Sequence, residues 1–532
     1  MNNINENMYE GRNISIILNN RKMENYLIRE FELTEGINEH QKLKLKIEVE
    51  NDKKNDLEEM IGKEETEIRI EVSGEDTSIG GKEIFKGIIN YFEMLEYGSE
   101  GYSVFMEAFS YSILFDRKIE KKYRVFQDKN FTYANIIDEI NKTYSNKDTQ
   151  IKYFKEADVP IGKLIIQYNE TDWEYLKRIA SYTGQPLMAN SNKVLVGFFK
   201  NMPAQTPNLK YSQFGKRTKE ERTYFKITGT EFYPVATPIK LKTRNRVSGE
   251  EVENDYYVLE NKIYNEGNML KCEYILGKQT DYFVDPIPHE KIRGAVIEAR
   301  TVHIARTDES KSEHGRTDGS SDNLEGRTMG IKPVNIYVAE EQEKNNNRSQ
   351  EVKASDIAVM TVDLTEGLRK LGGAVQSEGD KYAGKSYFPY VTPYSQSNTG
   401  FTPAPEVNDR VALYFPSENE TKAFVIGALN NDGNGRFTDV ANRNYHVGDS
   451  DFNMVLATNS LSTSAASSIS QTASSISESA DSISESAGNI SNSAKNYSEM
   501  IEEEKMIVSK NISQIAQGNT RIAYMAGKIA IK

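Results

Sequence analysis

The clearest chemical motif in the sequence is GDKYAGKS at Gly379–Ser386, which fits the phosphate-binding pattern G-x-x-x-x-G-K-[ST] at every position. Such a loop works where the N-terminus of a following helix presents its N–H groups to the nucleotide phosphates. Pro389 and Pro393 come soon after Ser386, and no helix starts in such a segment. We therefore interpret residues 379–386 as an exposed loop, with a nucleotide-binding assembly factor as an alternative function.

Metal chemistry within one chain is not predicted. Cys272 is the single cysteine, which excludes an internal disulfide and a thiolate zinc site. The histidines lack the H-x-x-x-H and H-x-H spacings of metal ligands; they are His40, His289, His303, His314 and His446. An axial ion held by three copies of His446 is an alternative. We expect no cofactor.

Carboxylate pairs that could perform acid–base work are also not predicted to form a catalytic site. Glycoside hydrolysis needs two carboxylates at a fixed separation across a cleft. Glu502–Glu504 and Asp308–Glu309 lie on an expected surface segment and a polar loop, so we interpret them as solvated charge. We predict that the protein is not an enzyme.

Composition narrows the function further. The chain has 532 residues, enough for several domains, and a formal net charge of −13. That acidity argues against binding a nucleic-acid backbone. The polar N-terminus is not a Sec signal, and no stretch reaches the apolar length that spans a bilayer.

The elements that must position any site are mostly short strands. Alternating segments before residue 111 indicate an antiparallel barrel, and helices are expected at 132–144 and at 172–182, where Trp173 packs in the core. Strands resume at 223–284, with a helix expected at 261–277. The prolines of 285–288 mark a boundary, and a later unit ends with a hairpin at 410–429. Long polar loops are expected within 307–353.

The C-terminal region carries an apolar residue at every seventh position from Ala466 to Ile529, and a second stripe starts at Ile469. The spacing alternates 3 and 4, as in a coiled-coil seam, so we predict that copies of the chain associate here. The predicted trimer interface of the tip comprises Ala466, Ile469, Ala473, Ile476, Ala480, Ile483, Ala487, Ile490, Ala494, Tyr497, Ile501, Val508, Ile515, Ile522 and Ile529.

The structure of this repeat is open on sequence grounds. Sixteen of the 39 residues from 460 to 498 are serine, an indifferent helix former. A weak coiled coil is the favoured interpretation, with a serine-rich trimeric β-spike and disorder as alternatives. A short β-prism strand is expected at 451–456, before the repeat.

Three segments in order resemble one known family. Phe85–Ile89 (FKGII) resembles its F-x-G-x-V strand, Arg124–Asp128 (RVFQD) its R-x-F-Q-D helix entry, and Gln167–Trp173 (QYNETDW) its Q-Y-x-E-S-D-x run. Pro405–Val411 and Ala423–Asn430 resemble the P-x-V-G-D-x-V and V-I-G-x-L hairpin of an OB-type barrel. Together these are similar to the VgrG and phage baseplate hub (late control D) family of contractile injection systems.

The resemblance implies a homotrimer that is mainly β with an α/β insert, two hub β-barrels and an OB-type barrel. Family members usually continue into a triple-stranded β-helix of Gly- and Val-rich repeats. This sequence departs from that pattern, because its heptads and the strand expected before them predict a coiled-coil or short β-prism tip. The predicted domains are 1–125 (first hub barrel), 126–205 (insert), 206–288 (second hub barrel), 289–430 (OB-fold barrel with long loops), 431–458 (linker or prism strand) and 459–532 (heptad-repeat tip).

The function that follows is a structural hub–spike protein that adapts a tail tube to a membrane-piercing spike. Expected partners are the chain itself, tail-tube and baseplate proteins, and a tip or effector protein at the C-terminus. The target membrane is contacted transiently, and no nucleic acid is bound. The protein would be made in the cytoplasm and delivered outside the cell within a particle. An effector-carrying spike with a toxic or cargo-binding C-terminus is a further alternative.

Overall fold

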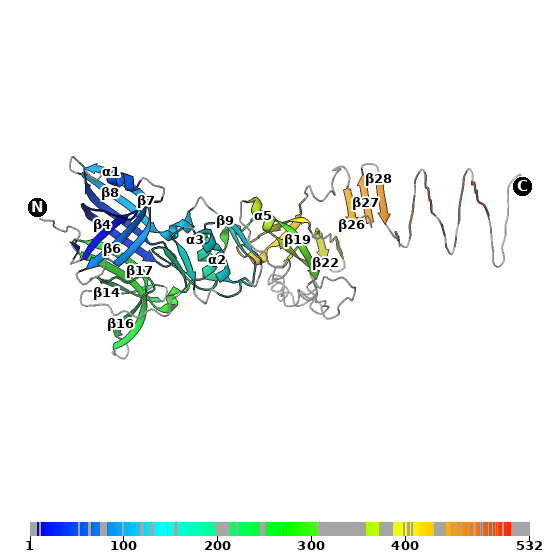
Figure 1. The fold of residues 1–532 in the computed structure, drawn as a ribbon. Coiled ribbons are helices and arrows are strands. Elements are labelled where there is room, and N and C mark those ends of the chain that lie inside the picture. Colours follow the sequence, from blue (N-terminus) through cyan, green and yellow to red (C-terminus); the bar gives the residue numbers. More distant parts are fainter. Residues whose placement is uncertain are drawn as a thin grey trace, which may run out of the picture. The chain divides into compact units, whose positions relative to one another are not determined.

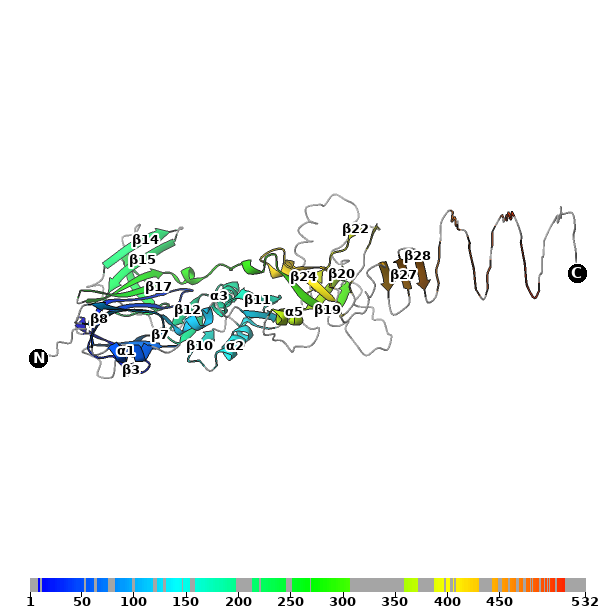
Figure 2. The ribbon, with the colours of Figure 1, turned by 90° about the horizontal axis from the view of Figure 1, so that it is seen from above.

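The computed structural model describes residues 8–9, 12–51, 54–61, 65–74, 82–97, 101–117, 122–127, 131–145, 147–153, 158–197, 213–219, 222–244, 251–267, 269–306, 358–371, 387–396, 399–401, 405, 408–429, 443–447, 452–457 and 460–465, and short stretches between 468 and 511. The chain divides into two units, Met1–Thr438 and Asp439–Lys532. Each is described by itself (Figures 1 and 2).

The largest element of the first unit is a 13-stranded antiparallel sheet. Its strands are β1 (Met8–Tyr9), β2 (Arg12–Leu18), β3 (Arg21–Lys22), β4 (Tyr26–Gly36), β5 (Lys42–Glu50), β6 (Glu67–Gly74), β7 (Lys82–Tyr97), β8 (Gly101–Ser110), β14 (Gln213–Lys219), β15 (Arg222–Gly229), β16 (Pro238–Arg244), β17 (Glu251–Glu266) and β18 (Met269–Gly277). The order is β1-β2-β6-β7-β8-β5-β4-β17-β18-β15-β14, with β3 beside β2 and β16 beside β17. Helix α1 (Lys54–Ile61) connects β5 to β6.

The two strand-rich regions that the sequence predicts as separate hub barrels join in this one sheet. β4 from the first region pairs with β17 from the second, with Leu33 opposite Ile263. Both residues belong to a single buried core that spans the two regions. The carboxyl group of Glu35 reinforces the junction by accepting a hydrogen bond from the backbone N–H of Val235 at 3.2 Å.

Alternation of apolar and polar residues predicted most of the strands. One segment was predicted wrongly. Residues 261–277, expected to be a helix, form the end of β17, a turn at Gly267 and β18. In β18, Leu270, Cys272, Tyr274 and Leu276 are buried and alternate with more exposed residues. Pairing of both strands within the large sheet therefore decides the structure of a segment whose apolar spacing also fits a helix.

The α/β insert occupies residues 111–196. Its elements are η2 (Tyr111–Asp116), β9 (Lys122–Phe126), α2 (Tyr133–Thr143), β10 (Gln150–Tyr153), β11 (Ile165–Glu170), α3 (Asp172–Tyr182), β12 (Leu187–Asn190) and β13 (Lys193–Val196). Both predicted helices are confirmed, and each begins with a capping box, at Thr132 and at Thr171. Trp173 is buried in the insert's core, as predicted.

Strands β9 and β11 form a two-stranded antiparallel sheet that separates two cores. Phe126 and Ile165 pair with each other and point into the core of the insert. Val125 and Ile166, the next pair along, point to the opposite side and join the core of the following domain. Because successive side chains of a strand alternate between faces, this small sheet is a wall shared by both cores.

That following domain is a five-stranded barrel. It contains β19 (Val296–Arg306), β20 (Ala358–Asp363), α5 (Thr365–Lys370), β21 (Tyr387–Pro389), β24 (Arg410–Tyr414) and β25 (Phe424–Ala428). The strand order is β21-β20-β19-β24-β25, and a bridge between Tyr390 and Val425 closes the sheet. The predicted hairpin at 410–429 is confirmed as β24 and β25. A separate hairpin pairs β22 (Tyr394–Gln396) with β23 (Thr399–Phe401).

The second unit contains a three-stranded antiparallel sheet of β26 (Arg443–Val447), β27 (Phe452–Ala457) and β28 (Ser460–Ala465). The strand expected at 451–456 is confirmed as β27, but it has two neighbours where the sequence suggested at most one strand. The favoured coiled coil over 459–532 is wrong for the described residues. Residues 460–465 are a strand, and the described stretches between 468 and 511 contain no helix (Figure 1).

The shared wall generates a matched pair of substitutions. Ile165→Ala and Ile166→Ala each remove the same fully buried side chain, from the insert's core and the barrel's core respectively. Each should lower the free energy of unfolding by about 2–5 kcal/mol. Hydrogen–deuterium exchange should rise in α2 and α3 for Ile165→Ala, and in β19 and β24 for Ile166→Ala. The same exchange pattern in both variants would contradict the assignment of two faces.

Candidate functional site

The first charged group in the interior of the insert is Asp172, at the start of α3. Its carboxylate accepts hydrogen bonds from Gln167 at 2.9 Å, from Lys122 at 2.9 Å and from Tyr144 at 2.7 Å. It also pairs with the guanidinium of Arg124 on β9. Four side chains, two from β9, one from β11 and one from the C-cap of α2, therefore meet on one carboxylate.

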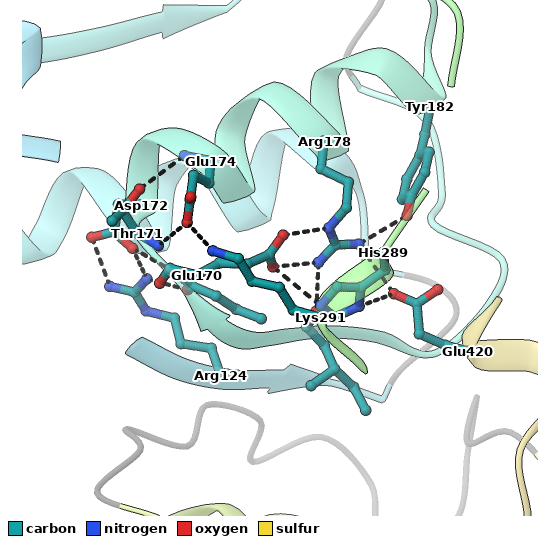
Figure 3. A network of polar contacts seen from close by, with 12 residues as sticks. Arg124, Glu170, Thr171, Asp172, Glu174, Arg178, Tyr182, His289, Lys291 and Glu420 are labelled. Carbon is teal, nitrogen blue, oxygen red and sulfur yellow. Dashed lines mark hydrogen bonds and ion pairs between the residues drawn. The ribbon is translucent and has the colours of Figure 1, made fainter. Parts of the chain in front are cut away.

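The second is Arg178, two turns later on the same helix and almost completely buried (Figure 3). Its Nε and Nη2 atoms donate to the two carboxylate oxygens of Glu170, both at 2.8 Å. Its Nη1 atom donates to Glu420 at 3.0 Å and to the hydroxyl of Tyr182 at 2.8 Å. Its Nη2 atom also donates to the carbonyl oxygen of Ile166 at 2.6 Å. All five guanidinium N–H groups thus have an acceptor.

His289 completes the group. It lies in the segment between β18 and β19, residues 278–295, which connects the large sheet to the barrel. Its Nδ1 atom lies 3.0 Å from Oε1 of Glu420, and its Nε2 atom lies 3.4 Å from Oε2 of Glu170. Glu420 begins η10 (Glu420–Lys422), the turn between β24 and β25. The imidazole therefore lies between a carboxylate of the insert and a carboxylate of the barrel (Figure 3).

Hydrogen bonds also join the shared wall to the barrel directly. The side-chain amide of Gln127 donates to Asp363 at 3.2 Å, and its oxygen accepts from the backbone N–H of Leu364 at 3.4 Å. We call the whole set the polar joint. It comprises Arg124, Gln127, Gln167, Glu170, Asp172, Arg178, His289 and Glu420.

The ionisation of the joint follows from opposing effects. Burial alone would raise the pKa of Asp172, but the positive charges of Arg124 and Lys122 and its hydrogen bonds lower that pKa to about 2. Burial likewise raises the pKa of Glu420, yet the hydrogen bond to His289 and the neighbouring cations outweigh burial and hold this pKa below its ordinary value. Both carboxyl groups are therefore charged at neutral pH, as a buried pair of opposite charges requires.

The geometry of the joint suits attachment between domains. Arg178 has no free N–H group, and the carboxylates of Glu170, Asp172 and Glu420 are all engaged. The joint connects β9, β11 and α3 of the insert with the segment that carries His289 and with η10 of the barrel.

A second polar cluster resembles a Ser-His-Asp arrangement but has the wrong geometry for hydrolysis. His40 Nδ1 lies 2.6 Å from Ser112 Oγ, and His40 Nε2 lies 3.4 Å from Asp116 Oδ2. In serine hydrolases the serine contacts Nε2 and the aspartate contacts Nδ1. Ser112 is also buried, and the imidazole packs on Trp173 with ring centroids 4.2 Å apart. This cluster packs the large sheet against the insert.

The motifs singled out in the sequence lie elsewhere. Residues 379–386 are outside the described residues, and the segment that follows them is strand β21 rather than a helix. The polar loops of 307–353 are also outside the described residues, as are the side chains of His303, His314 and His446. Among the residues that the structure describes, no group of three His, Cys, Asp or Glu side chains could hold a metal.

The predicted tip interface is partly described. Six of its members lie outside the described residues: Ala466, Ala473, Tyr497, Ile515, Ile522 and Ile529. The others are exposed in the single chain: Ile469, Ala480, Ile483, Ala487, Ile490, Ala494, Ile476, Ile501 and Val508. Their contact with other copies stays a prediction.

Arg124, Gln167 and Asp172 stood out in the sequence only as parts of motifs without a role, and Arg178 and His289 were missed as site residues. One signal was available. Helix 172–182 carries an arginine on the same face as its apolar core residues, and a buried arginine needs acceptors nearby. No sequence pattern pointed to Glu420, because its partner Arg178 is 242 residues away.

Comparison with known proteins identifies the part of the chain that carries most of the joint. Residues 34–196 match the family described as phage tail baseplate hub (GPD). This region is similar to phage tail baseplate hub proteins. Arg124, Gln167, Asp172 and Arg178 lie within the matched region, whereas Glu420 lies outside it. No curated protein matches the sequence significantly.

Solved structures share the fold at low identity. The lidded PdpA-VgrG complex of Francisella contains a chain with TM-score 0.53 and 10% identity, covering 86% of this chain and 77% of that chain. Its half-lidded form gives TM-score 0.52 and 10% identity, covering 86% and 84%. The E. coli c3393 protein, described as a type VI secretion component, gives TM-score 0.45 and 10% identity, covering 76% and 100%. The chain is mainly β, and the two PdpA-VgrG matches, both with a TM-score above 0.5, show that it shares the fold of a chain in those complexes. Within the described residues, no helix is both long and apolar enough to cross a bilayer.

Removal of the central cation tests the joint. Arg178→Met leaves Glu170 and Glu420 buried without their main partner, so the free energy of unfolding should fall by about 3–5 kcal/mol. In a triple variant that also carries Glu170→Gln and Glu420→Gln, the unpaired charges are gone and more than half of the loss should be recovered. Urea unfolding measures both. A loss below about 1 kcal/mol for Arg178→Met would contradict the joint.

The pH dependence of the free energy of unfolding in acid tests the lowered pKa of Asp172. Because its pKa is lowered to about 2, this group stabilises the fold above the unfolded-state pKa near 4 and loses that effect as pH falls toward 2. The stability difference between the native protein and Asp172→Asn should therefore shrink by about 1 kcal/mol between pH 6 and pH 3. Urea midpoints across that range provide the measurement. A constant difference would mean that Asp172 carries no depressed pKa.

Proposed function

We propose that the chain is a structural hub–spike protein of a contractile injection machine, which acts as a homotrimer and performs no catalysis. The observation that carries this proposal is the polar joint, which fastens a region similar to phage tail baseplate hubs to a five-stranded barrel within one polypeptide. We infer that this barrel is of the OB type and that it begins the spike. The large sheet then acts as the platform for the tail tube.

A buried joint suits a part that transmits axial force. Contraction would push the hub domain against the barrel, and a hinge between them would absorb the thrust. Here apolar side chains of β9 and β11 pack in the barrel's core, and the buried guanidinium of Arg178 binds Glu420 of the barrel. Separating the domains would expose both the apolar core and unpaired charges, which is costly.

The exposed isoleucines of the second unit support self-association. Ile469, Ile476, Ile483 and Ile490 recur every seven residues, and each is 56–59% exposed in the single chain. Such equal exposure indicates equivalent positions in a repeating extended structure. Apolar side chains repeated along one segment are typical of surfaces that other chains cover. We therefore retain the tip residues as a trimer interface, formed by extended chain in the described part.

The remaining partners follow from the same proposal. Tail-tube and baseplate proteins would bind the hub domain, and a tip protein or effector would bind the C-terminal end. The protein would need no cofactor, would travel outside the cell as part of the particle, and would contact a target membrane only during injection.

Replacement of the four isoleucines by serine tests the trimer. The full-length native protein should have the mass of three copies at micromolar concentration. A variant with Ile469, Ile476, Ile483 and Ile490 all changed to Ser should dissociate at concentrations at least ten-fold higher, because each buried isoleucine contributes about 1.5–3 kcal/mol. Mass measurement across a dilution series provides the readout.

A matched control changes the residue next to each isoleucine. Ser470, Ser477, Ser484 and Ser491 are also exposed, and their replacement by Thr should leave the dissociation concentration unchanged. A native protein that is monomeric at micromolar concentration would rule out the homotrimer.

A further inference from the structure

One carboxyl group of the first unit is buried without a cation beside it. Glu35 lies near the end of β4, directly opposite Asn261 of β17, where the two strand-rich regions of the large sheet meet. Both side chains are buried. Within the parts of the chain that the structure describes, no Lys, Arg or His side chain forms an ion pair with Glu35. We call the pairing of β4 with β17, together with the contacts of Glu35, the seam.

The groups that hydrogen-bond to this carboxyl are uncharged. The side-chain amide of Gln41 donates to Oε1, and the backbone N–H of Val235 donates to Oε2 at 3.2 Å. Gln41 also accepts a hydrogen bond from the backbone N–H of Ser191 at 2.6 Å, which connects the seam to the insert. A buried carboxylate normally has a cation as its partner. An ionised Glu35 would therefore be an unpaired buried charge.

The charged and titratable side chains on the strands around this carboxyl have partners of their own. Lys262 of β17 pairs with Glu32 at 2.6 Å. The hydroxyl of Tyr233 donates to the carboxylate of Glu231, and the hydroxyl of Tyr274 on β18 donates to the carbonyl oxygen of Glu231. The cation of this set is thus already neutralised by a different carboxylate.

The loop that follows β4 adds a negative charge near the seam. Glu39 is exposed, and its Oε2 atom lies 3.0 Å from the position that a Cβ atom would take at Gly36, the neighbour of Glu35. His40 is directed to Asp116 of the insert, with Nε2 3.4 Å from Oδ2. These surroundings disfavour a second negative charge at Glu35.

Asn261 has the complementary need. Its side-chain N–H donates to the carbonyl oxygen of Tyr233 at 3.2 Å. Its Oδ1 atom is buried and has no hydrogen-bond partner. Because Asn261 is directly opposite Glu35, a proton on the carboxyl would supply the donor that Oδ1 lacks. A single proton would then remove both an unpaired charge and an unpaired acceptor.

We infer that Glu35 is held as the uncharged carboxylic acid at neutral pH, and that its proton is a switch: the seam is closed while Glu35 keeps the proton and is weakened when the proton leaves. Burial raises the pKa of Glu35, and the hydrogen bonds with Val235, Gln41 and Asn261 lower it less. Since the unfolded-state pKa is about 4.3, the proton stabilises the fold fully below that pH. Its effect is lost as pH rises through the raised pKa of the folded state.

Infrared spectroscopy of the full-length protein detects the proton directly. Ionised carboxyl groups lack the carbonyl band of a carboxylic acid, so a protonated Glu35 stands out at pH 7. The native protein should show this band, Glu35→Gln should lack it, and in the native protein it should disappear as the pH is raised. A native protein without the band at pH 7, or the same band in Glu35→Gln, would overturn the inference.

Urea unfolding measures the link between the proton and stability. From pH 5.5 to pH 7 the unfolded chain releases this proton while the folded chain keeps it. The folding equilibrium constant of the native protein should therefore fall at least ten-fold relative to that of Glu35→Gln. Glu30→Gln is the matched control, because Glu30 is exposed on the same strand, and this variant should differ from the native protein by a constant factor. A constant factor for Glu35→Gln as well would contradict the switch.

Hydrogen–deuterium exchange locates the effect within the sheet. At a pH where the infrared band of the native protein has disappeared, β4 and β17 should exchange at least ten-fold faster in the native protein than in Glu35→Gln. Strands β7 and β8 of the same sheet lie away from the seam and should exchange alike in the two proteins. Equal exchange in β4 and β17 at that pH would show that the proton does not control the seam.

Discussion

The first unit depends on one buried cation. Arg178 is removed from water with its full charge, and an unpaired charge in such a place would be prohibitive. Its five N–H groups are satisfied only if Glu170, Tyr182, Ile166 and Glu420 all take fixed positions. These partners belong to a strand, a helix and a turn of the next domain. The hydrogen bonds of one guanidinium thus set the relation between the insert and the barrel.

The polar joint and the apolar wall contribute in different ways. Burial of Val125, Leu164 and Ile166 in the barrel's core supplies non-directional free energy, which would tolerate a slight rotation of the barrel. The bidentate pair between Arg178 and Glu170 is directional and tolerates little. Buried ion pairs often add little net stability, so their effect here is to select one orientation among those that the apolar contact allows.

Short-range sequence signals predicted the two helices of the insert, whereas strand pairing in the large sheet decided the structure of the segment that was predicted wrongly. Thr132 and Thr171 were recognisable as helix starts because a capping residue acts within one turn. Residues 261–277 were not recognisable as strands by the same means, because their apolar spacing also fits a helix and the hairpin they form is held between β4, more than 200 residues earlier, and β15. The joint shows the same limit: its motif residues in 124–172 were visible, while His289 and Glu420 come from distant segments. The seven-residue period was real, but period alone does not distinguish two helical turns from one extended repeat.

The two units differ in where their folding free energy comes from. The first has large cores of its own, so a single copy can fold. The second has three short strands and isoleucines that remain more than half exposed in one chain. A small sheet of this kind is marginal in water unless another surface covers it. The proposed trimer would supply that surface, and the fold of the tip would then form together with the assembly. In such an order, the first unit would fold within each copy, and the second unit would fold as copies associate.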